Sequence, residues 1–244
     1  MRWLSRTWDR RPDIAELELI GLASVAGAIW TFIKVADRME DGTLERFDER
    51  VLLAFRPGED RTKPIGPEWV EVAVRDVTAL GGTGVLSLVT LSVIGYLLLT
   101  RRWRTAGFVL AAVVSGASIN LWLKESYARD RPALVPDIGP TYSASFPSGH
   151  TMMSTVTYMS LAALLARTHE KRRVRGYLVG VASLLSVLIG ISRVYLAVHW
   201  PSDVLAGWAA GSVWALLGWS ILRWLQRHHM AEEPGEEGLD ADDD

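Results

Sequence analysis

Long apolar stretches separated by short polar segments constrain this chain more than any other feature of its sequence. The clearest are residues 84–100, 105–123 and 204–222, none of which contains a charged side chain. A helix needs about 20 mostly apolar residues to cross a bilayer, and these stretches have that length or come close to it. The sequence therefore predicts an integral membrane protein built from helices.

We expect an all-α fold, a polytopic membrane helix bundle with six transmembrane helices. The expected spans are residues 17–36, 78–100, 105–123, 151–166, 177–197 and 204–222. Residues 17–225 would form one domain, with a cytoplasmic segment 1–16 before it and a cytoplasmic tail 226–244 after it. The first apolar stretch could instead be a cleaved signal, but it is longer than a usual signal core and no clear cleavage site follows it.

The composition supports this class of protein and limits its chemistry. Tryptophan is abundant, with 11 residues, as in proteins that place aromatic rings at the membrane interface. Cysteine is absent, which excludes disulfides and thiolate metal sites. The net charge of -2 hides an asymmetry, because residues 231–244 hold eight acidic residues and no basic one. We predict that this tail is disordered and that the folded part is mildly basic.

Residues 37–83 are expected to form a long first loop that carries two short interfacial helices. In the first helix, apolar residues recur at helical spacing between charged ones, at Leu44, Phe47, Val51, Leu52 and Phe55. The second helix, residues 68–80, is followed by Gly81 and Gly82, which would end it. This loop could serve packing and connection only, or it could act as a lid or a ramp for substrate.

Basic residues predict how the bundle lies in the membrane. The turn 101–104 carries three basic residues and the turn 167–175 carries five, and such residues favour the cytoplasmic side. With six spans, both turns fall on the same side as the two termini. The loops 124–150 and 192–203 then meet on the opposite face. We expect that face to be the periplasmic or outer face of the cell inner membrane.

The loop 192–203 contains three groups suited to phosphate chemistry. Arg193 offers a planar fork of donors for phosphate oxygens. His199 can act as a nucleophile or as a proton carrier near neutral pH. Asp203 follows it by one helical turn and could hold the imidazole in one tautomer. The alternative is that Arg193 and His199 are ordinary interfacial residues and that Asp203 caps a helix.

The neighbouring outer loop carries further residues that fit a known pattern. The chain contains Lys-x6-Arg-Pro from Lys124 to Pro132, Pro-Ser-Gly-His at residues 147–150, and Ser-Arg-x5-His-x3-Asp at residues 192–203. In order and in spacing, these motifs resemble the three-part signature of the type 2 phosphatidic acid phosphatase (lipid phosphate phosphatase) superfamily, in its bacterial membrane branch. Each motif alone is a modest signal, whereas all three on one predicted membrane face are a specific one.

The resemblance implies a role for each matched residue. His199 would form a phosphohistidine, Asp203 would orient it, and His150 would protonate the leaving group and later activate water. Five residues would bind the phosphate: Lys124, Arg131, Ser148, Gly149 and Arg193. These roles are chemically sound, because transfer of a phosphoryl group needs positive donors around its oxygens. A glycine lets the backbone approach closely, and a helix that starts at residue 148 or 149 would direct free N–H groups at the anion.

The sequence therefore indicates an integral membrane phosphatase that removes a terminal phosphate from a lipid at the outer face. We expect no metal and no other cofactor, the lipid bilayer and a lipid phosphate as partners, and no nucleic acid. Undecaprenyl pyrophosphate is the favoured substrate, because that carrier is dephosphorylated on the outer side. The alternatives are phosphatidylglycerophosphate, phosphatidic acid and lipid A phosphates, a lipid phosphotransferase on the same site, or a non-enzymatic lipid carrier. The oligomeric state is not indicated.

Overall fold

The computed structural model describes residues 14–133 and 143–227, which form helices joined by turns and contain no strand. The helices are α1 (Ile14–Glu40), α2 (Glu45–Ala54), α3 (Glu68–Ala79), α4 (Thr83–Leu99), α5 (Trp103–Tyr127), α6 (Gly149–Arg167), α7 (Arg172–Tyr195) and α8 (Pro201–Arg227). The expected all-α fold is confirmed. Most of the expected end segments 1–16 and 226–244 lies outside the described residues.

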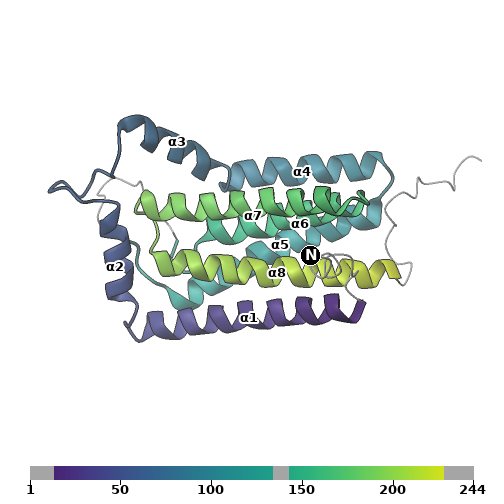
Figure 1. Cartoon of the computed structure of the whole chain (residues 1–244), viewed down its shortest axis with the longest axis horizontal. Coiled ribbons are helices and arrows are strands. Elements are labelled where there is room, and N and C mark those ends of the chain that lie inside the picture. Colours follow the sequence, from purple (N-terminus) through teal and green to yellow (C-terminus); the bar gives the residue numbers. More distant parts are fainter. Residues whose placement is uncertain (1–13, 134–142, 228–244) are drawn as a thin grey trace, which may run out of the picture.

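The helices α1 and α4 to α8 run side by side as a bundle, and α2 crosses one end of it (Figure 1). The helix α3 precedes α4 and is bent by 43° from it, at a short break that contains Gly81 and Gly82. The two short helices expected in the first loop are therefore present. Their position on the membrane surface stays a prediction.

Among the described residues, four helices are long and apolar enough to cross a membrane: α1, α5, α7 and α8. The bent pair of α3 and α4 makes a fifth candidate if the pair counts as one span. The helix α6 is not among them. It has 19 residues, and its buried side chains include Thr151, Ser154, Thr155 and Thr157. The expected count of six spans is therefore not confirmed, although the bundle has the form of a multi-pass membrane protein.

The helix α6 can be this polar because other helices surround it. It packs most extensively on α7 and α8 and also contacts α5 and α4. The hydroxyl groups of Ser154 and Thr155 both donate to the carbonyl oxygen of Thr151, at 3.1 and 2.8 Å. Such bonds within the helix satisfy polar groups that would be costly to expose to lipid.

Two glycines bring α8 into close contact with α6. A Cβ atom at Gly207 would lie 3.0 Å from the carbonyl oxygen of Ser148, and one at Gly211 would lie 2.8 Å from that of Met152. Glycines spaced by four residues share one helix face and let two membrane helices approach through their backbones. This contact sets the relative position of two helices whose first turns carry predicted catalytic residues.

The described parts of the loop 124–150 meet the loop 192–203 at the end of the bundle that α2 covers. Arg131, from the first loop, donates from Nη1 to the carbonyl oxygen of Val198 in the second, at 2.9 Å. The basic turns 101–104 and 167–175 lie at the opposite end (Figure 1). The expectation that the two motif-bearing loops share a face is thus confirmed, whereas the cytoplasmic position of the other face stays a prediction.

The α6–α8 contact predicts that Gly211→Ala destabilises the protein, because the added methyl group meets backbone and the Cβ of Thr155 at 2.8 Å. Overpacking of this kind costs about 1–3 kcal/mol, which lowers the melting temperature by about 2–4 °C per kcal/mol in a chain of this size. Gly180→Ala is the matched control, because nothing lies within 4 Å of a Cβ there. Thermal unfolding in detergent measures both variants, and equal shifts would contradict the close contact.

Candidate active site

The chain between α7 and α8 turns sharply and thereby presents His199. After α7, Ala197 adopts a left-handed conformation with φ 53°, which reverses the chain at the helix end. The helix α8 then begins at Pro201, a residue that favours the first helical position. The carboxylate of Asp203 accepts the N–H of Trp200 at 2.9 Å, as an acidic residue in a first helical turn commonly does. The local sequence therefore places the carboxylate directly beside His199.

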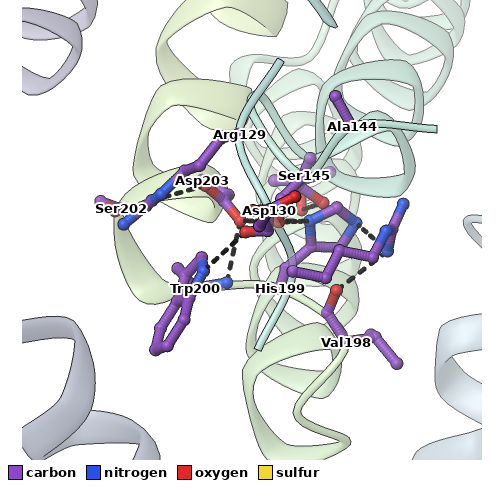
Figure 2. A network of polar contacts seen from close by, with 12 residues as sticks. Arg129, Asp130, Ala144, Ser145, Val198, His199, Trp200, Ser202 and Asp203 are labelled. Atoms are coloured by element: carbon purple, nitrogen blue, oxygen red, sulfur yellow. Dashed lines mark hydrogen bonds and ion pairs between the residues drawn. The ribbon is translucent and has the colours of Figure 1, made fainter. Parts of the chain in front are cut away.

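His199 is held between a carboxylate and a guanidinium. Its Nδ1 lies 3.3 Å from Oδ2 of Asp203, and its Nε2 lies 3.3 Å from Nη1 of Arg131 (Figure 2). The imidazole is almost fully buried, at 1% exposure. Burial lowers the pKa of His199 to about 3, against the opposing effect of Asp203. The ring is therefore neutral near pH 7 and, with its proton on Nδ1, carries an electron pair on Nε2, on the side of Arg131.

Both oxygens of the Asp203 carboxylate accept hydrogen bonds. Besides His199 and Trp200, Ser145 donates its hydroxyl proton to Oδ2, and Arg129 donates from Nη1 to Oδ1 at 2.8 Å. Ser145 Oγ also lies 3.2 Å from Nδ1 of His199. A carboxylate with this many donors stays ionised although it is fully buried.

A cavity of about 700 Å³ brings together most of the predicted site residues. It is lined by Lys124, Arg131, Gly149, His150, Arg193 and His199. Asp203 lies behind His199 and does not line the cavity, which suits a residue that acts through the imidazole. Ser148 does not line it either. That side chain is fully buried, and its hydroxyl oxygen accepts a hydrogen bond from Thr151 at 2.9 Å. A phosphate-binding role for Ser148 stays a prediction.

Three of the lining residues, Lys124, Arg131 and Arg193, form a cationic cluster. None of them makes a salt bridge with any carboxylate in the described part of the chain. Their donors bind neutral groups instead, such as Ala144 O for Lys124 and Thr78 Oγ1, at 3.1 Å, for Arg193. Nε of Arg193 is buried without a hydrogen-bond partner among the described residues. Positive charges left without a counter-ion give this end of the cavity a field that favours anions, and the phosphate-binding role of the three residues stays a prediction.

Gly149 begins α6 beside this cluster, and the packing around it is tight. A Cβ atom would lie 3.1 Å from Oδ1 of Asn120 and 3.5 Å from Cε of Lys124. The first turn of α6 therefore comes close to Lys124. Free N–H groups at a helix start favour a bound anion, and they add to the charge of the cluster.

His150 lines the same cavity as His199 from the first turn of α6. Its ring makes no hydrogen bond with any of the described residues. The short break between α3 and α4 lies close to this ring. A Cβ atom at Gly82 would be 3.8 Å from Nε2 of His150. The two histidines thus face one cavity, His150 from the first turn of α6 and His199 from the segment between α7 and α8.

Away from the cationic cluster, the cavity becomes apolar and continues between α4 and α5. It is lined there by Leu86, Leu91, Ile94, Leu110, Val113, Val114, Ala117 and Leu121. Several of these, including Leu91 at 64% and Leu121 at 60% exposure, also face the outside of the bundle. In a membrane protein that outside is the lipid, so the cavity joins a charged end to the hydrocarbon region of the bilayer.

The described residues offer no group of three His, Cys, Asp or Glu side chains that could hold a metal ion. The expectation that the protein works without a metal stays a prediction.

Sequence reasoning missed Ser145 and Arg129, which contact Asp203 of the predicted set, and Asp48, which contacts Arg129. Arg129 lies inside the first motif, two residues before Arg131, where an extended segment can direct two side chains to neighbouring groups. Asp48 lies on α2, more than 150 residues before Asp203. From the sequence, the charged residues of α2 are expected to face water, and no motif spacing links them to the site.

Comparisons with known proteins agree with this geometry. Phosphatidylglycerophosphatase B of Bacillus subtilis is 33% identical over 149 residues, which cover 59% of this chain and 70% of that protein. An undecaprenyl-diphosphatase of Sulfolobus acidocaldarius is 34% identical over 137 residues, 51% of this chain and 59% of its own. A lipid A 1-phosphatase of Rhizobium johnstonii is 32% identical over 124 residues, 47% of this chain and 46% of its own.

A solved structure extends the likeness to the whole bundle. The crystal structure of a transmembrane PAP2-type phosphatidylglycerolphosphate phosphatase from Bacillus subtilis superposes with a TM-score of 0.74 at 26% identity. The match covers 84% of this chain and 98% of that one. The model of the PAP2 superfamily matches residues 86–227, more than half of the chain, and includes every residue of the three motifs. The chain therefore belongs to the PAP2 superfamily, as its motifs predicted.

Proposed function

We propose that this protein is a lipid phosphatase that removes a terminal phosphate through a phosphohistidine on His199. One observation carries the proposal: a neutral imidazole, backed by a carboxylate, faces unpaired cations in a cavity that opens toward the bilayer. A protein that only bound phosphate would need the cations but no oriented nucleophile. The complete set of His199, Asp203 and His150 therefore favours catalysis over a non-enzymatic lipid carrier.

In the first step, Nε2 of His199 attacks the terminal phosphorus in line with the bond to the lipid oxygen. The P–N bond forms as that P–O bond breaks, and His150 gives a proton to the departing oxygen. Burial and the neighbouring cations lower the pKa of His150 to about 3, and the charge of the bound phosphate opposes this effect and favours the protonated form beforehand. Asp203 keeps the proton on Nδ1 and stabilises the positive charge that develops on the ring. The cationic cluster stabilises the equatorial oxygens.

In the second step, water takes the place of the lipid. His150, now neutral, accepts a proton from the water as its oxygen attacks phosphorus. The P–N bond then breaks, His199 regains its electron pair, and inorganic phosphate leaves. A lipid phosphotransferase would use the same site but pass the phosphoryl group to another hydroxyl. The outer-loop segment that could select such an acceptor lies partly outside the described residues.

The apolar part of the cavity supports a lipid substrate, because a free sugar phosphate would gain nothing from it. The relatives act, by their names, on phosphatidylglycerophosphate, on undecaprenyl diphosphate and on lipid A. The sequence alone favours undecaprenyl pyrophosphate. Phosphatidylglycerophosphate is the stronger candidate now, because the structural match to such a phosphatase covers 84% of this chain.

We further propose that the active site faces the periplasm or outside of the inner membrane, with both termini in the cytoplasm. The support is the separation of charge along the bundle. The basic turns 101–104 and 167–175 lie at one end, and the site lies at the other (Figure 1). Basic residues in short loops favour the cytoplasmic side.

The covalent mechanism predicts that His199→Ala lowers phosphate release by about 10³- to 10⁶-fold, the range for loss of a catalytic nucleophile. His150→Ala should lower it by about 10²- to 10⁴-fold. Phosphate release is measured with purified protein and a panel of phosphatidylglycerophosphate, undecaprenyl pyrophosphate, phosphatidic acid and lipid A. His169→Ala, in the exposed basic turn, is the matched control and should keep full activity. Hydrolysis retained by His199→Ala would remove the covalent mechanism, and label moving to an acceptor lipid would indicate a transferase.

Inhibition separates this mechanism from a metal-dependent one. Vanadate should inhibit, because it forms a five-coordinate species on an imidazole nitrogen that resembles phosphorus in transfer. Excess chelator should leave the rate within about twofold, because the proposed charge stabilisation comes from side chains. Both are read as initial rates of phosphate release. Loss of activity with chelator, restored by a divalent cation, would contradict the metal-free proposal.

The absence of cysteine makes the orientation directly testable. Asp60→Cys lies in the first loop and Arg173→Cys in a basic turn, and both positions are exposed. A membrane-impermeant maleimide added to intact cells should label residue 60 and should label residue 173 only after the membrane is opened. The reverse pattern would place the site in the cytoplasm.

A further inference from the structure

The helix α2 carries a charged residue that an interfacial helix does not need. Asp48 is fully buried, at 0% exposure, although it lies on a helix of the first outer loop. Its Oδ1 accepts the backbone N–H of Ser202 at 2.9 Å, and its Oδ2 accepts the hydroxyl of Ser202 at 2.5 Å. Asp48 therefore binds the first turn of α8, whose free N–H groups attract a carboxylate.

Arg129 joins this carboxylate to that of the active site. Its Nη2 donates to Oδ2 of Asp48 at 2.8 Å, and its Nη1 donates to Oδ1 of Asp203 at 2.8 Å. Nη1 also lies 2.7 Å from Oγ of Ser202. The guanidinium packs over the ring of Trp200, with 5.4 Å from its carbon to the ring centre (Figure 2). One planar cation thus binds two buried carboxylates in a fixed geometry.

We propose that Asp48 and Arg129 are positioning residues for the nucleophile, acting on His199 through Asp203. We name Asp48, Arg129 and Asp203 the carboxylate relay. The inference rests on the proposed function and adds to it that a helix of the first outer loop takes part in catalysis. Neither residue lines the cavity, so neither is expected to touch the substrate.

The charges of the relay explain why two carboxylates are present. Arg129 alone would neutralise Asp203 and weaken its hold on a positively charged His199. With Asp48 included, one cation faces two anions, and the relay keeps a single negative charge for the imidazolium that forms during phosphoryl transfer. Without Arg129, two buried carboxylates would lie near each other with no cation between them, and their repulsion would favour protonation of one of them.

This charge balance predicts an ordered set of effects. Arg129→Gln leaves two uncompensated carboxylates and should lower kcat by about 10- to 100-fold, the range for loss of a hydrogen bond to a charged group. Asp48→Asn should lower kcat less, because Asp203 stays paired. The double variant Asp48→Asn/Arg129→Gln restores a single negative charge. Its kcat should be at least about tenfold higher than that of Arg129→Gln. KM should stay within about twofold throughout.

A second measurement reports on His199 without any turnover. The chain has five histidines, so nitrogen NMR of histidine-labelled protein in detergent can be assigned with a His199→Gln sample. In the native protein, His199 should be neutral with its proton on Nδ1. In Arg129→Gln it should become a mixture of the two tautomers, and in the double variant it should return to the native form. A native protein that hydrolyses none of the lipids would refute the proposed function, while this spectrum would still test the relay.

The matched control is Arg75→Gln on α3, which removes an exposed arginine from its salt bridge with Glu71 at 2.7 Å. It should change neither kcat nor the histidine spectrum. Size-exclusion profiles and melting temperatures show whether each variant is folded, and Arg129→Lys retains the charge if Arg129→Gln does not fold. The relay would be overturned by a raised KM with unchanged kcat, by a native His199 spectrum in Arg129→Gln, or by a double variant no better than Arg129→Gln.

Discussion

The structure depends on one buried negative charge that has to be fully hydrogen-bonded. Burying an unpaired carboxylate in a low-dielectric interior is costly, so its donors must be held in place by the fold. Asp203 receives them from separate parts of the chain: Arg129 after α5, Ser145 before α6, and Trp200 and His199 before α8. The segments that carry the three motifs are therefore held together by hydrogen bonds to this one side chain.

The imidazole of His199 separates two regions of opposite charge balance. On the cavity side stand Lys124, Arg131 and Arg193, which have no carboxylate partner among the described residues. On the far side, Asp203 and Asp48 outnumber the single cation between them. In the proposed mechanism, a phosphate that enters the cavity would meet these cations, and the positive charge produced on the ring would meet a net negative one. The histidine would thus lie where charge develops during phosphoryl transfer, before substrate arrives.

The bundle and most of the site could be predicted from the sequence, because both rest on local patterns. Apolar stretches gave the long helices, and motif spacing identified His150, His199 and the cationic cluster. The expected count of six spans was not confirmed, since α6 is polar where its neighbours enclose it and so lacks the apolar signal. Asp48 could not be predicted, because its partners Ser202 and Arg129 come from distant segments and a charge on an amphipathic helix normally faces water.

For the proposed lipid substrate, the part of the cavity between α4 and α5 would determine how substrate is supplied. The charged end of the cavity lies at one end of the bundle, and its apolar end is lined by side chains of α4 and α5 that would face the lipid. A lipid held there keeps its headgroup at the membrane surface where it entered, and its dephosphorylated product returns to that same leaflet. The protein would therefore draw on one leaflet only, and a substrate made on the other side must first be moved across by a separate flippase.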